Sequence, residues 1–152
     1  MKKSLLIGAV MVLVIIGAIM FSQKDKNADS GLLIGPNAIN VTEQVPSSEV
    51  RISMVVLEDK GYVVIHKIFA GVPADVIGAS ALLPKGKSEN TPVSLSSPLL
   101  LGQEYTAMLH LDDSDGVFDA TVDLPVQDPI SGGPVMMQFE VSAAGDPDAM
   151  SI

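Results

Sequence analysis

The sequence predicts an all-β protein: an antiparallel immunoglobulin-like sandwich of about seven strands, preceded by one N-terminal transmembrane helix. Three observations support this prediction. A long apolar run follows two lysines at the N-terminus, short segments of alternating apolar and polar residues fill the remainder, and turn residues and prolines separate those segments. A small barrel is the alternative arrangement of the same strands.

The N-terminal segment has the length and composition of a membrane anchor. Residues 4–23 are uncharged, and at about 1.5 Å per residue they are long enough to cross a bilayer core. Because no Ala-x-Ala pattern follows Phe21, we expect an uncleaved anchor; a cleaved signal peptide and a secreted product are the alternative. Lys2, Lys3 and the free amine precede the run, so we expect a single-pass protein of the cell membrane with a cytoplasmic N-terminus and an extracytoplasmic C-terminal domain. The charge margin is small, so the opposite orientation stays open.

Composition divides the chain into four parts. We expect a membrane anchor or signal segment over 1–23, a polar tether over 24–36, the exported sandwich over 37–144, and a flexible tail over 145–152.

The part beyond the anchor is strongly acidic. Past Asn27 the chain has 5 basic and 17 acidic residues, a net charge of −12. Because phosphate contacts dominate nucleic-acid affinity, we expect no nucleic-acid partner. The chain has no cysteine, which excludes disulfides, thiolate metal sites and a cysteine nucleophile. An acidic surface of this kind is consistent with solubility or with cation binding.

Alternation of apolar and polar residues locates the strands. The expected strands are Ala38–Val45, Val50–Leu57, Tyr62–Ile68, Ala74–Ser80, Thr91–Leu95, Gln103–Leu111 and Pro134–Ser142. Alternation also predicts which side chains share the buried face of a strand. The expected sets are Val50, Ile52, Met54 and Val56; Tyr105, Ala107, Leu109 and Leu111, opposed by Thr106, Met108 and His110; and Val135, Met137, Phe139 and Val141.

Three segments together resemble a known family. They are Gly61–His66, then Asp75–Leu83 leading into Lys85–Asn90, then Tyr105–Asp119. In their order and spacing they are similar to an uncharacterised domain, a domain of unknown function, found in exported archaeal surface proteins and in small bacterial proteins with one N-terminal anchor. The resemblance covers roughly Val41 to Ala143. It implies a secreted or surface-exposed immunoglobulin-like β-sandwich and no established activity.

An acidic loop is the candidate calcium site. Calcium binds oxygen ligands, and closely spaced carboxylates on a turning backbone supply several of them. The candidate ligands are Asp112, Asp113, Ser114, Asp115, the Val117 carbonyl and Asp119, and Asp123 and Asp128 could complete the shell. Members of the resembled family often have a longer Asp/Asn/Gly-rich loop here. The loop of this chain is shorter and lacks the final glutamate of an EF-hand, so an ordinary acidic turn is the alternative.

Two histidines form an alternative metal site. His66 and His110 each lie in an expected strand, and neighbouring strands would bring them together with Met136 or a carboxylate to bind copper or zinc. Met108, on the same strand face as His110, is another thioether candidate. The alternative is that each histidine is simply hydrogen-bonded to backbone or water.

No catalytic motif is present. The sequence has no Gly-x-Ser-x-Gly, no phosphate-binding glycine loop and no His-Glu-x-x-His, so we expect no enzyme. We expect instead a membrane-anchored extracytoplasmic binding or structural module of unknown specificity. Calcium could stabilise this module, and its partner would be an unidentified surface protein or ligand. An extracytoplasmic copper-binding protein using His and Met ligands is the alternative function.

Overall fold

The computed structural model describes residues 35–145, and the expected anchor, most of the tether and most of the tail lie outside this range. Contacts divide the chain into two units, Met1–Leu33 and Ile34–Ile152, and all of the described residues belong to the second unit. Within the described range, no helix has the length and apolarity needed to cross a membrane.

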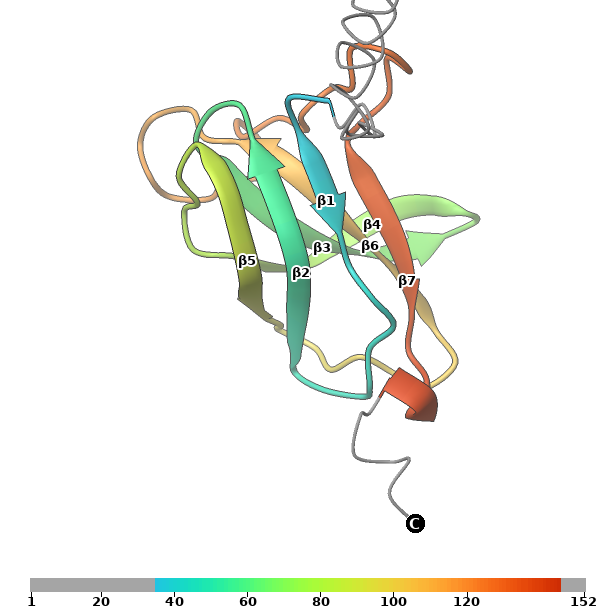
Figure 1. The fold of residues 1–152 in the computed structure, drawn as a ribbon. Coiled ribbons are helices and arrows are strands. Elements are labelled where there is room, and N and C mark those ends of the chain that lie inside the picture. Colours follow the sequence, from blue (N-terminus) through green and yellow to red (C-terminus); the bar gives the residue numbers. More distant parts are fainter. Residues whose placement is uncertain (1–34, 146–152) are drawn as a thin grey trace, which may run out of the picture. The chain divides into compact units, whose positions relative to one another are not determined.

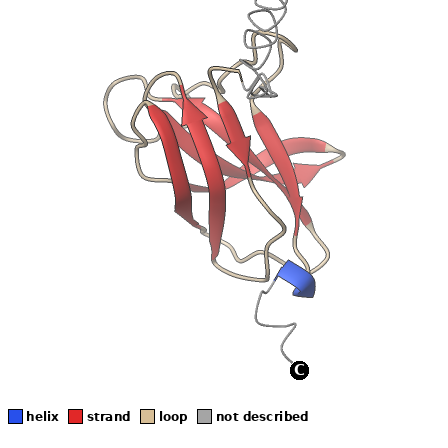
Figure 2. Ribbon diagram, in the orientation of Figure 1, coloured by secondary structure: helices blue, strands red, loops and turns tan. Residues whose placement is uncertain are grey.

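Seven strands form two antiparallel sheets (Figures 1 and 2). The first sheet has the order β1-β2-β5 and the second β4-β3-β6-β7. The strands are β1 Ala38–Asn40, β2 Glu49–Leu57, β3 Gly61–Phe69, β4 Val72–Ala79, β5 Gly86–Ser94, β6 Glu104–Leu111 and β7 Met136–Glu140. A single 3₁₀ turn, Ala143–Gly145, follows them. The expected antiparallel all-β class with seven strands is therefore confirmed.

The core lies between the two sheets. It consists mainly of aliphatic side chains from β2, β3, β5 and β6, with Phe139 and Val141 from the end of the chain. Tyr105 stacks on Phe139 with ring centroids 5.9 Å apart. Tyr105, Ala107 and Leu109 are buried here as expected, but Leu111 is 40% exposed because β6 ends at that residue.

The expected buried face of β2 is wrong in its second half. Val50 and Ile52 are buried as expected, but the next buried residues are Val55 and Leu57, while Met54 and Val56 are only half-buried. Opposite this change of phase lies Asn90 of β5, whose φ of 51° is left-handed. The left-handed residue Asn90 thus coincides with the point at which the buried face of β2 changes, and strict period 2 does not anticipate this change.

Two expected strands differ from the observed strands by more than two residues at one end. β5 begins at Gly86, not at Thr91, because the polar stretch from Gly86 to Asn90 pairs along β2 with side chains that are mostly exposed. A polar strand of this kind shows no alternation of apolar residues in the sequence, so only its hydrogen-bonded pairing with β2 identifies it as a strand. β1 ends at Asn40, and the chain then continues to an isolated bridge between Gln44 and Val141.

β3 and β6 are buried on both faces. The burial pattern is continuous from Gly61 to His66 and from Tyr105 to His110. Alternate residues of these two runs line the core, and the others lie on the opposite face of the sheet. The segment that follows β6 turns back along it: Leu111 N–H donates to Leu124 O at 2.9 Å, and Val126 N–H donates to Leu109 O at 2.8 Å. This second buried face carries both histidines of the chain.

Candidate functional site

Strand register brings the two histidines onto one face of the second sheet. His66 pairs with Thr106, Val64 pairs with Met108, and Tyr62 pairs with His110. Side chains two residues apart on a strand point the same way, so all six share the face turned away from the core. All six are buried.

The two imidazole rings lie close together. Their centroids are 5.7 Å apart and their planes are 20° from parallel. At a metal–nitrogen distance of about 2.0 Å, the centres of two imidazoles on one ion are separated by about 5–6 Å. The observed separation between the His66 and His110 ring centres lies within this range.

Each ring is oriented by a backbone carbonyl. His66 Nδ1 is 2.9 Å from Ala74 O of β4, and His110 Nδ1 is 2.7 Å from Asp123 O in the segment after β6. A carbonyl can only accept, so each Nδ1 carries a proton, and in the neutral ring the lone pair is then on Nε2. Metal-binding histidines are commonly fixed in this way, by a hydrogen bond from the other ring nitrogen.

The two Nε2 atoms have no hydrogen-bond partner. His66 Nε2, His110 Nε2 and Thr106 Oγ1 are buried side-chain atoms without a partner, and all three lie on this face. A buried polar atom without a partner loses its hydration and receives nothing in return, so such atoms are rare in native proteins. Burial also lowers the pKa of His110, which favours the neutral form that binds metals.

The methionines differ in position. Met108 occupies the register position between the two histidines and is 5% exposed. Met136, the thioether expected from the sequence, pairs with Met108 from the edge strand β7 and is 39% exposed. Thr106 escaped sequence reasoning, although it shares the alternation of Met108 and His110.

An aromatic ring covers one end of this face. The Phe118 ring lies edge-on to Tyr62 at 5.4 Å and edge-on to His110 at 5.7 Å, measured between centroids. Phe118 belongs to the acidic loop, residues 112–123, and Tyr62 Oη donates to Asp112 Oδ1 of that loop at 3.1 Å. The loop and the histidine face are therefore one packed unit.

The acidic loop brings together three carboxylates. Asp112, Asp113 and Asp123 each offer an oxygen, and these oxygens lie within 4.8 Å of one another. The group includes two of the expected calcium ligands and Asp123, which is 1% exposed, but not Asp115 or Asp119. Ser114 has a left-handed φ of 87°, and the Val117 side chain is exposed. Calcium binding in this loop stays a prediction.

Hydrogen bonds within the loop already engage its carboxylates. The buried Asp123 accepts from Asp113 N–H at 2.9 Å and from Asp119 N–H at 2.7 Å. Asp112 also accepts from Gly116 N–H at 3.0 Å, and Asp115 accepts from Val117 N–H at 2.8 Å. The Thr121 hydroxyl and backbone N–H lower the pKa of Asp119. These bonds give the carboxylates a structural role that requires no ion.

We expect Tyr62 to ionise only near pH 12. Burial raises the pKa of Tyr62 from 10.0 to about 12, and the Asp112 hydrogen bond and the neighbouring negative charges add to the effect. Since the folded-state pKa lies above the unfolded value, this group's stabilising contribution is complete below pH 10 and is lost as the pH rises toward 12. The measurement is the tyrosinate absorbance against pH.

A Tyr105→Phe background isolates the titration, because the chain has only two tyrosines. Adding Asp112→Asn removes the charge that accepts the Tyr62 hydrogen bond and should move the midpoint down. Titration of folded protein near pH 10 in the Tyr105→Phe background would contradict the buried hydrogen bond.

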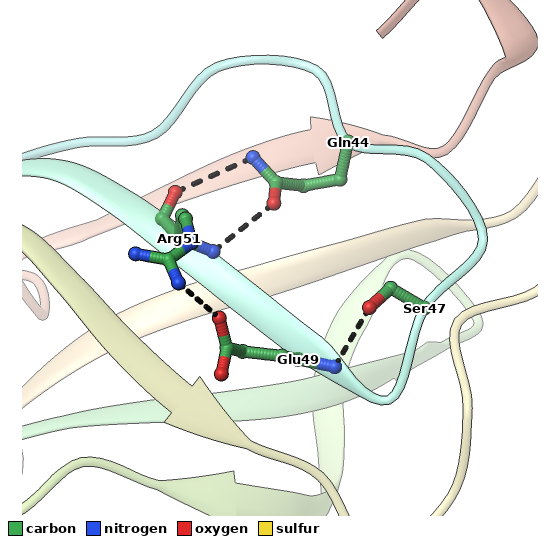
Figure 3. A network of polar contacts seen from close by, with 4 residues as sticks. All are labelled: Gln44, Ser47, Glu49 and Arg51. Atoms are coloured by element: carbon green, nitrogen blue, oxygen red, sulfur yellow. Dashed lines mark hydrogen bonds and ion pairs between the residues drawn. The ribbon is translucent and has the colours of Figure 1, made fainter. Parts of the chain in front are cut away.

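A concave region lies at the first sheet and is lined mainly by polar residues. It is a cavity of about 350 Å³ lined by Gln44, Glu49, Arg51 and neighbouring polar residues. As Figure 3 shows, the Gln44 amide bridges to the backbone of Arg51, and the Arg51 guanidinium pairs with Glu49 at 3.0 Å. These contacts hold the segment after β1 against β2, and no unpartnered buried side-chain atom lines this cavity.

Comparisons with known proteins give a family but no function. Neither the curated proteins nor the solved structures yielded a match. A family model described as a domain of unknown function, DUF7282, matches residues 37–142, well over half of the chain. The chain therefore belongs to the DUF7282 family of domains of unknown function, as the resemblance to an uncharacterised domain family anticipated.

Proposed function

We propose that this chain is a membrane-anchored, extracytoplasmic module that binds a copper ion through His66 and His110. One observation carries the proposal: two buried imidazoles lie 5.7 Å apart, each with Nδ1 bound to a carbonyl and Nε2 without a partner. An ion bound by both Nε2 atoms would satisfy two of the three orphaned atoms on this face. No catalytic step is part of the proposal.

The cellular setting of the proposal comes from the sequence. The uncharged run over 4–23, with its preceding lysines, supports an anchor with the domain outside the cell. The strand orders β1-β2-β5 and β4-β3-β6-β7 support an immunoglobulin-like topology in which consecutive strands β2 and β3 lie in different sheets. In this setting the domain would hold copper at the membrane surface.

Thermal unfolding of protein from which metal ions have been removed with a chelator tests the copper proposal. Copper(I) under reductant, copper(II), zinc(II) and calcium are added separately. A ligand that binds only the folded state at one hundred times its dissociation constant should stabilise it by about 2.7 kcal/mol. We expect copper to raise the midpoint, and we expect His66→Gln and His110→Gln to abolish that rise.

The matched control is Asp115→Asn, which changes an exposed residue of the acidic loop and should leave the copper effect intact. Equilibrium dialysis then gives the stoichiometry, one ion per chain, independently of any change in stability. A midpoint raised by calcium alone would favour the acidic loop, and the absence of any copper effect would refute the proposal.

A further inference from the structure

The ligands available on the histidine face are uncharged. Within residues 35–145 no carboxylate joins either histidine in a group of three ligands, and the acidic group of the neighbouring loop contains neither histidine. Both oxygens of Asp123, whose carbonyl orients His110, are engaged by backbone N–H groups. None of these carboxylates is therefore grouped with the two histidines as a direct ligand.

A third donor lies between the histidines. Met108 precedes His110 by two residues on the same face of β6, and it is diagonal to His66 because His66 pairs with Thr106. Diagonal neighbours on a sheet are within reach of a long side chain. Met108 is also almost fully buried, so its thioether faces no competition from solvent.

Uncharged, buried ligands favour a singly charged, soft ion. The cost of moving an ion from water into a protein interior rises with the square of its charge, and none of the candidate ligands carries a negative charge that would offset part of this cost. Thioethers select copper(I), whereas zinc(II) and copper(II) are usually bound with harder or anionic ligands. The two imidazoles are fixed with their lone pairs on Nε2, the form that copper(I) accepts.

We infer that the site is selective for the cuprous ion, which is bound by His66 Nε2, His110 Nε2 and the Met108 thioether. This inference rests on the proposed copper site and adds its oxidation state and its third ligand. Of the two methionines that the sequence suggested as thioether ligands, this inference selects Met108 and not Met136.

Anaerobic competition against a chromophoric copper(I) chelator tests the inference on the full-length chain. Zinc(II) and copper(II) affinities are measured in parallel. Met108→Leu conserves volume and should keep the fold. We expect it to weaken copper(I) binding at least about tenfold, because loss of even an outer-shell partner costs about 10–100-fold, and to leave zinc(II) binding unchanged.

The matched control is Met136→Leu, the register neighbour of Met108 on β7, for which we expect no change in copper(I) affinity. X-ray absorption at the copper edge should show a sulfur neighbour in the wild type and in Met136→Leu, but not in Met108→Leu. Equal copper(I) affinities for wild type and Met108→Leu, or tighter binding of zinc(II) than of copper(I), would overturn the inference and leave the proposed metal site standing. Failure of the wild type to bind any of the three ions would overturn both.

Discussion

Replacing Leu109 by alanine should lower the free energy of unfolding by about 2–5 kcal/mol, the range for a large-to-small change in a packed core. Leu109 is fully buried on β6, a strand with a neighbour on each side, and belongs to the cluster between the two sheets. Loss of its branched end leaves a cavity that two flanking strands cannot close. For a domain of this size, the melting temperature should fall by roughly 10 °C or more.

Leu111→Ala is the matched control for this experiment. It makes the same chemical change two residues further along the same strand, but at a side chain that is 40% exposed. We expect its effect on the free energy of unfolding to stay below about 1 kcal/mol. Urea unfolding of both variants measures the difference, and equal losses would contradict the assignment of Leu109 to the core.

Replacing Asp123 by alanine should destabilise the protein by roughly 2–4 kcal/mol, because it leaves two backbone N–H groups without their acceptor. Those groups belong to Asp113 and Asp119, and the carboxylate that binds them is almost fully buried. The Asp123 carbonyl also orients His110, so disorder in the loop should weaken copper binding as well. Urea unfolding, amide exchange at Asp113 and Asp119, and copper affinity are the measurements.

Asp128→Ala controls for the general cost of removing an aspartate from a loop. Asp128 also accepts a backbone N–H, from Ile130 at 2.8 Å, but at a solvent-accessible turn, and among the described residues it makes no hydrogen bond to either histidine. We expect a loss of less than about 1 kcal/mol and no effect on copper affinity. Comparable losses in the two variants would show that Asp123 has no special structural role.

Alternation in the sequence predicted much of the second sheet. Thr106, Met108 and His110 do lie on the face opposite Tyr105, Ala107 and Leu109. Period 2 holds there along the whole of β6, whose core-facing and outward-facing side chains alternate without interruption from Tyr105 to His110. The same rule failed in β2, where the buried face changes opposite Asn90, because a left-handed residue on the partner strand leaves no mark in the hydropathy of β2.

The closeness of the His66 and His110 side chains could not be predicted from the sequence, for a different reason. Their proximity depends on β3 and β6 being neighbours, and strand order is a property of the whole chain. β4 also departs from regular register opposite His66, and Ala74 O lies within hydrogen-bonding distance of the His66 ring. The burial of Asp123 could not be predicted either, because nothing in the sequence distinguishes it from the other aspartates of the loop.

The orientation of the histidines by distant carbonyls has a consequence for how the protein is made. The rings come from β3 and β6, and the carbonyls that orient them come from β4 and from the segment after β6. No short stretch of the chain contains the complete site, so a polypeptide still emerging from a ribosome or passing through a membrane in extended form cannot hold an ion there. If the domain binds copper as proposed, the metal is acquired only after these strands have paired, and its occupancy marks the molecules that have finished folding.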